Sequence, residues 1–108
     1  MPQGKVKPPA GDPVEVDPRH YTLEFENDRV RVLRVKYGPH EKSVMHKHPA
    51  TLTVSLTNRD WKFTLPDGRT QNIIGRPGEI VWYEAHEHLP ENLSSKPYEG
   101  IHIELKGK

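Results

Sequence analysis

The chain has 108 residues, of which 32% are hydrophobic and 29% charged, and its formal net charge is +1. This length predicts one domain with a modest core, and a charge so close to zero argues against a nucleic-acid-binding surface. The sequence has no cysteine, which excludes disulfides and thiolate metal sites. No apolar run approaches the roughly 18 residues of a membrane helix, and no signal-peptide pattern precedes the domain, so we expect a cytoplasmic protein.

The first 19 residues differ from the rest of the chain. They contain five of the eleven prolines and show no apolar periodicity. Such a composition is typical of an arm or a linker. The sequence therefore predicts a Pro-rich arm over residues 1–19 and a folded domain over residues 20–108. We expect the arm to lie along its own domain or along a partner subunit.

From residue 20 onward, short alternating segments are separated by turns. Tyr21, Leu23 and Phe25 begin the series, and turn-forming residues such as those of 66–68 divide the segments. Further strands are expected near 30–37, 51–57, 61–65, 70–74, 79–84 and 100–105. No stretch has a long helical period. Short strands with turns about every eight to twelve residues predict an all-β sandwich or barrel.

A histidine pair one residue apart, His46 and His48, comes just before the strand expected at 51–57, and His88 follows the one at 79–84. Side chains at positions i and i+2 of a strand point to the same face. If one strand runs unbroken from 46 to 56, Leu52 and Val54 share that face and line the same pocket. Three imidazoles from two paired strands would form one side of a metal site with open positions for substrate.

Four further residues are candidates around this site. Glu84 and His86 could act as acid–base residues or as an additional ligand, but a solvated charge and a solvated rim histidine are the simpler interpretations. Phe63 and Trp82 could line the substrate pocket or belong to the ordinary core.

Other charged or ionisable residues are expected outside the site. Arg31, Arg34 and Arg59 could each anchor a carboxylate, although a solvated strand face is the simpler interpretation for each. His20 and His102 are expected to be surface or structural residues.

Two stretches of the chain resemble the two motifs of the cupins. Residues 38–59 resemble the first motif with its H-x-H pair, and residues 77–92 resemble the second, with Gly78, His88 and Asn92 in the expected places. The resemblance covers residues 20–106. It implies a single-domain cupin jelly roll, that is, a β-barrel of the double-stranded β-helix type, and it implies pairing into a homodimer.

The departures from the motifs bear on chemistry. The usual motif-one glutamate ligand falls on Leu52, and the motif-one glycine falls on Arg59, while Glu84 and His86 replace a proline and a glycine of motif two. The chain is thus similar to three-histidine cupins such as the dioxygenases that cleave acetylacetone and other β-diketones. Neutral ligands leave the full charge on a divalent ion, which favours an anionic, chelating substrate.

These observations support one main hypothesis and two alternatives. The main one is a non-haem dioxygenase that binds Fe(II) at His46, His48 and His88 and acts on a small enolate or β-diketone-like substrate. Imidazole ligands also suit Zn, Ni, Mn or Co. The alternatives are a non-catalytic module that binds a metal and a small anion, and a Lewis-acid isomerase or lyase.

Overall fold

The computed structural model of the chain describes residues 11–107. Within this range there are one short helix and nine strands. Their bounds are α1 Pro13–Val16, β1 Tyr21–Glu26, β2 Val30–Tyr37, β3 His46–His48, β4 Thr51–Ser55, β5 Arg59–Thr64, β6 Thr70–Gly75, β7 Ile80–Tyr83, β8 His86–Asn92 and β9 Tyr98–Leu105.

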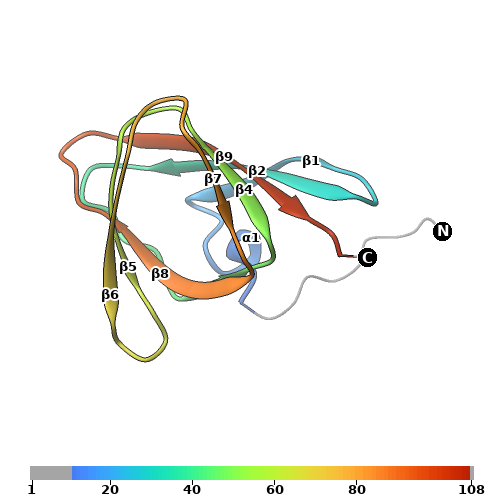
Figure 1. Cartoon of the computed structure of the whole chain (residues 1–108), viewed down its shortest axis with the longest axis horizontal. Helices are drawn as coiled ribbons and strands as arrows, with labels where there is room; N and C mark the ends of the chain where they lie inside the picture. The colour runs from blue at the N-terminus through green and yellow to red at the C-terminus, as the bar shows by residue number, and fades with distance from the viewer. Residues whose placement is uncertain (1–10, 108) are drawn as a thin grey trace.

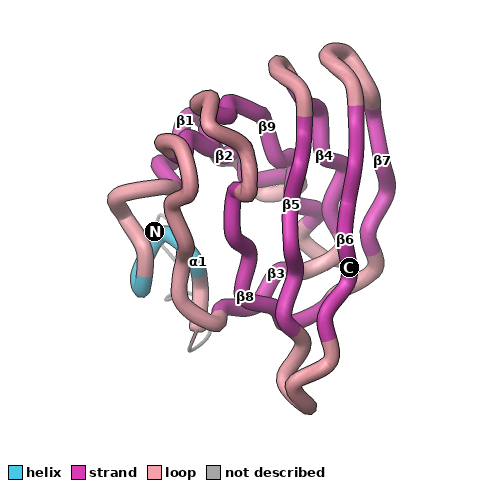
Figure 2. Tube along the Cα trace, turned by 90° about the vertical axis from the view of Figure 1, so that its left-hand side faces the viewer, coloured by secondary structure: helices cyan, strands magenta, loops and turns pink. Residues whose placement is uncertain are grey.

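The strands form two antiparallel sheets that face each other (Figures 1 and 2). One sheet has the order β1-β2-β9-β4-β7 and the other the order β3-β8-β5-β6. Strands distant in sequence are neighbours, as β2 and β9 are over eight paired positions. This arrangement confirms the all-β jelly-roll class predicted from the sequence.

The hydrophobic core is largely aromatic. Its buried members come from both sheets and are Tyr21, Leu33, Val35, Tyr37, Trp61, Phe63 and Tyr98. Edge-to-face contacts connect the rings of Tyr37 and Trp61, 4.5 Å apart, and those of Trp61 and Tyr98, 4.9 Å apart. The core occupies one part of the space between the sheets, and buried polar side chains occupy the rest.

The expected unbroken strand from 46 to 56 is wrong. Pro49 and Ala50 interrupt it, so that β3 pairs with β8 in one sheet and β4 pairs with β7 and β9 in the other. Because the chain changes sheets here, the inward positions change from even to odd numbers. The buried side chains of β4 are the hydroxylic ones, namely Thr51, Thr53 and Ser55.

The same inversion gives the five-stranded sheet an apolar outer face. The strand register places one apolar residue of each strand in a continuous line across this sheet. We call this line the outer apolar row; its members are Phe25, Val32, Ile103, Leu52 and Trp82. Phe25 is 54% exposed and Trp82 is 44% exposed.

Residues 11–19 pack on the domain. Asp12 caps α1 by accepting a hydrogen bond from the Val14 N–H, and Pro13 is buried. The helix lies against β1 and β3, and the Lys47 N–H donates to the Gly11 carbonyl at 2.8 Å. The part of the expected arm before residue 11 lies outside the described residues.

Within residues 11–107, no helix is long and apolar enough to cross a membrane.

Candidate metal centre

Three buried histidines converge where β3 meets β8. The register sets His46 opposite His88, with His48 two residues along on the same side of β3. The exposed fractions of His46, His48 and His88 are 0%, 4% and 4%. One ring nitrogen of each lies within 4.8 Å of one from each of the other two. The convergence expected from the H-x-H spacing is therefore confirmed, and the cluster could hold one metal ion.

The hydrogen bonds leave at least one nitrogen of each ring free. His46 Nδ1 donates to the Val44 carbonyl at 2.9 Å, and His48 Nδ1 donates to Glu104 Oε2 at 3.3 Å. The Nε2 atoms of both rings are buried without a partner, and so are both nitrogens of His88. His46 and His48 thus have the arrangement typical of a ligand imidazole, in which the second nitrogen donates to a neighbour. The donor set therefore fits a divalent ion that accepts neutral nitrogen ligands.

A buried chain of hydrogen bonds and ion pairs holds the His48 ring. Arg31 Nε donates to Glu104 Oε1 at 3.0 Å, and the Arg31 guanidinium also pairs with Asp12. Burial raises the pKa of the Glu104 carboxyl, while Arg31 opposes that rise. The chain from His48 through Glu104 and Arg31 to Asp12 thus connects the centre to the residue that caps α1.

A second network supports His46. Its Nδ1 lies 3.2 Å from Ser43 Oγ, and Ser43 donates to Asp17. Asp17 Oδ2 is 2.7 Å from His20 Nδ1, and His20 Nε2 is 2.9 Å from Glu41 Oε1. His20 is therefore a buried structural residue.

Burial keeps the triad neutral. Desolvation, followed by the neighbouring charge of His48, lowers the pKa of His46 to about 3, and desolvation lowers that of His48 to about 3. The pKa of His88 is also well below its ordinary value, mainly because of burial. Neutral imidazoles have their lone pairs available for a metal ion over a wide pH range.

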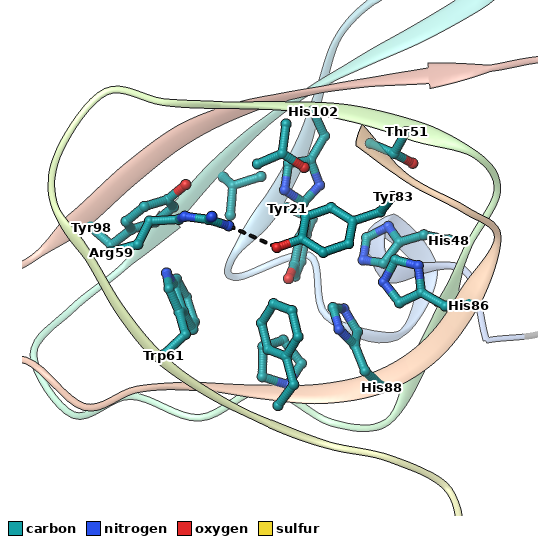
Figure 3. Close-up of a pocket in the computed structure, with 14 residues that line it drawn as sticks. Tyr21, His48, Thr51, Arg59, Trp61, Tyr83, His86, His88, Tyr98 and His102 are labelled. Carbon is teal, nitrogen blue, oxygen red and sulfur yellow. Dashed lines mark hydrogen bonds between the residues drawn. The ribbon is translucent and has the colours of Figure 1, made fainter. Parts of the chain in front are cut away.

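Two of the three histidines, His48 and His88, line a cavity between the sheets, which is drawn in Figure 3. Apolar side chains form part of its wall, including Phe63, whose ring centroid is 4.4 Å from that of His88. Polar side chains complete the wall. They include Thr51, Thr53, Arg59, Tyr83, His86, Tyr98 and His102.

Several residues expected in the pocket lie outside it. Leu52 and Val54 are on the outer face for the reason given above. In β7 the inward residue is Tyr83, so Trp82 points outward and donates from Nε1 to Glu84 Oε2 at 2.7 Å. Glu84 is exposed in this pair. The expectation failed because the chain changes sheets between β7 and β8, which shifts the alternation as it does after β3.

His86 does line the cavity. It pairs across the strands with His48, and its ring centroid is 4.4 Å from that of His88. Its Nδ1 donates to the Glu84 carbonyl at 2.7 Å, and its Nε2 is buried without a partner. A catalytic role for His86 stays a prediction.

Two cavity residues were expected elsewhere. Arg59 was assigned to a solvated strand face, yet it is only 6% exposed. It has the same parity as Trp61 and Phe63, so the alternation of β5 could have revealed it. His102 lies on the polar side of β9, which proves to be the inner side, and its ring centroid is 5.2 Å from that of His48.

Comparisons with known proteins identify the fold. A scan of protein-family models and a search of curated proteins found no match. Solved structures do match. A cupin domain from Bordetella pertussis has a TM-score of 0.74 at 24% identity, over 81% of this chain and 92% of that one. A double-stranded β-helix protein from Klebsiella pneumoniae has a TM-score of 0.64 at 16% identity, over 95% and 80%.

A third similar structure is the polyketide cyclase RemF from Streptomyces resistomycificus. Its TM-score is 0.54 at 20% identity, over 73% of this chain and 56% of RemF. Together these similarities show that the chain has the cupin fold.

Replacement of Glu104 tests the support of His48. Because Glu104→Gln removes the carboxylate that accepts the His48 Nδ1–H, we expect zinc affinity to fall about 10- to 100-fold. Competition with a chromophoric chelator would measure the change. Glu99→Gln, which alters a partly exposed ion pair of Arg34, is the matched control and should leave the affinity unchanged. Equal affinities of both variants and the unaltered protein would contradict the role of Glu104.

The lowered pKa values predict how stability depends on pH in the metal-free protein. His46 and His48 remain neutral when folded down to about pH 3, whereas the unfolded chain takes up protons below about 6.5. Their stabilising contribution is therefore complete above pH 6.5 and is lost as the pH falls towards 3, by about 1.4 kcal/mol per pH unit for each ring. Urea unfolding between pH 7.5 and 5 would measure the slope. The variant His46→Gln/His48→Gln should have a smaller slope, and an identical slope would refute the assignment.

Proposed function

We propose that this chain binds one divalent metal ion at His46, His48 and His88 and is a dioxygenase acting on a small enolate or β-diketone-like anion. The observation that carries this proposal is the group of buried, unpartnered ring nitrogens that lie within 4.8 Å of one another, beside a cavity that His48 and His88 line. Burying such groups without a partner is costly, and a bound ion would satisfy them. The cupin fold of the chain supports the same assignment.

The ligand set favours a redox metal with an anionic guest. A bound Fe(II) would mediate electron transfer from the substrate, which is the net reductant, to dioxygen, and we propose it as the native ion. The three neutral imidazoles do not compensate the charge of a divalent ion, so the cavity favours a negatively charged chelator.

The chain itself would position and shield the substrate. The rings of Phe63 and Trp61 form an apolar wall that limits water in the cavity. His86 offers its unpartnered Nε2 as an acceptor for a hydrogen bond from the substrate, next to His88. Glu84 has no place in this mechanism, because it is paired with Trp82 outside the cavity.

The decisive test combines metal content with oxygen uptake. We expect about one iron per chain after anaerobic loading with Fe(II), and oxygen consumption when 2,4-pentanedione is added. His46→Ala, His48→Ala and His88→Ala should each reduce bound iron to near zero, because two imidazoles bind much more weakly than three. Elemental analysis, an oxygen electrode and circular dichroism would measure iron, turnover and folding.

His40→Asn is the matched control, since His40 is an exposed histidine. It should keep both iron and activity. Full iron content in a His46→Ala/His88→Ala variant would contradict the site. Iron binding without oxygen uptake over a panel of enolisable substrates would contradict the dioxygenase.

A second candidate function is supported by the similarity of the fold to that of the polyketide cyclase RemF. We propose as the alternative a Lewis-acid reaction without a redox step, such as an isomerisation, lyase or cyclisation reaction. Turnover by the zinc-loaded protein without oxygen would favour this alternative, whereas turnover that requires Fe(II) and oxygen would favour the dioxygenase.

We also propose that two copies pair through the outer apolar row. Five apolar residues in line across one sheet form a surface that water solvates poorly, and a second copy offers the same row by symmetry. Exposed Phe25 and Trp82 at the two ends of the row support this proposal.

Light scattering after gel filtration tests the pairing. We expect the mass of two 12.4 kDa chains for the unaltered protein and of one chain for Leu52→Lys, because a charge in the middle of an apolar interface is costly. Ile74→Lys is the matched control: Ile74 is 70% exposed on the other sheet, and its variant should stay dimeric. A monomeric mass for the unaltered protein at a concentration of about 50 µM would contradict the proposal.

A further inference from the structure

Arg59 is a buried cation on the wall of the cavity. β5 turns Arg59, Trp61 and Phe63 inward, and Arg59 is 6% exposed. One guanidinium nitrogen donates to the Tyr83 hydroxyl at 3.1 Å, and Nε is buried without a partner. A guanidinium stays charged at any physiological pH, so this position holds a permanent positive charge.

Within residues 11–107, no acid forms a direct ion pair with Arg59. The partly buried Arg31 pairs with both Asp12 and Glu104, but no carboxylate lies within 4.0 Å of the Arg59 nitrogens. The nearby acid is Glu79, which lies beside Gly75 on the same side as Arg59, but its Oε1 accepts the Arg76 N–H at 3.1 Å and forms no hydrogen bond with the guanidinium. A buried charge without a direct ion pair costs stability. A protein retains such a charge most readily where a ligand supplies the opposite one.

The position of Arg59 indicates where that ligand would extend. Figure 3 shows Arg59 on one side of the cavity and His48 and His88 on the other, with Tyr83 between them. Trp61 and Phe63 form the wall along this path. A molecule that reaches both ends therefore needs a metal-binding group at one end, an apolar body and an anionic group at the other.

We propose that Arg59 binds a carboxylate at the far end of the substrate, so that the preferred substrate class is a carboxylated β-diketone or related keto acid, with 2,4-pentanedione as a weaker substrate that lacks the carboxylate. This proposal rests on the proposed function for the metal-binding end of the molecule. A single planar guanidinium matches a carboxylate in both charge and geometry, because its two N–H groups can donate to two oxygens. The Tyr83 hydroxyl, already bonded to Arg59, holds the guanidinium in place.

Binding of two matched diketones tests this proposal without relying on turnover. The probes are 2,4-pentanedione and 4,6-dioxoheptanoate, which carries the same diketone and a terminal carboxylate. Calorimetric titration of the zinc-loaded protein should give about 10- to 100-fold tighter binding of the carboxylated probe, the range typical of a charge-assisted hydrogen-bonded pair. Arg59→Met should bind both probes equally, and Arg59→Lys should keep part of the difference.

Arg34→Met is the matched control, because Arg34 lies on the outer face in exposed ion pairs with Glu24 and Glu99. It should keep the full preference. Equal binding of the two probes by the unaltered protein would overturn the proposal, and so would a preference that survives in Arg59→Met.

Elemental analysis distinguishes a failure of the metal site from a failure of the Arg59 proposal. If elemental analysis finds no zinc, the proposed function fails, and Arg59 is tested in the metal-free protein with 4-oxopentanoate and neutral 2-pentanone. The carboxylate should raise the melting temperature of the unaltered protein and of Arg34→Met, but not that of Arg59→Met. No difference between the unaltered protein and Arg59→Met would overturn the proposal in this case as well.

Discussion

The pairing of β3 with β8 is the constraint on which the candidate site depends. It is only three residues long, yet it sets His46 opposite His88 and His48 opposite His86. Four imidazoles thereby meet in a space from which water is largely excluded. A one-residue slip of this register would turn the histidines of one strand to the other face and dissolve the cluster. The networks through Ser43 and Glu104 support the two histidines of β3 from behind, so the site is positioned by the sheet and held by buried hydrogen bonds.

The sequence predicted the outline of this arrangement. The all-β class followed from short alternating segments, and the triad followed from the H-x-H spacing together with His88, because local alternation survives in any strand of two or three residues. The orientation of β4 and β7 could not be predicted in the same way. Alternation gives two faces but not which face is inward, and the interruptions at Pro49 and before His86 each move the chain to the other sheet. Leu52 and Trp82 were therefore placed in the pocket, when they belong to the outer apolar row.

The usual rule that apolar side chains point inward is reversed in part of this small domain. β4 and β9 turn Thr51, Thr53, His102 and Glu104 inward and place their aliphatic residues outside. Polar side chains therefore fill part of the interior, and the aromatic cluster around Trp61 supplies much of the hydrophobic packing. Arg59 is a further example, because a buried cation without a direct ion pair is explained as part of a binding surface.

The contacts that connect His48 through Glu104 and Arg31 to Asp12 determine which residues the folded, metal-binding unit must include. By composition, everything ahead of β1 looks dispensable, and the alternating strands alone look like the domain. Yet Arg31 pairs with both Asp12 and Glu104, and Glu104 accepts the hydrogen bond from His48, one of the three candidate ligands. A fragment that begins at residue 20 would lack Asp12, so Arg31 would pair with Glu104 alone. It would also lack Asp17, which accepts a hydrogen bond from Ser43 next to His46. Residues 11–19 therefore support the candidate metal centre and should be retained whenever the domain is excised or fused to another protein.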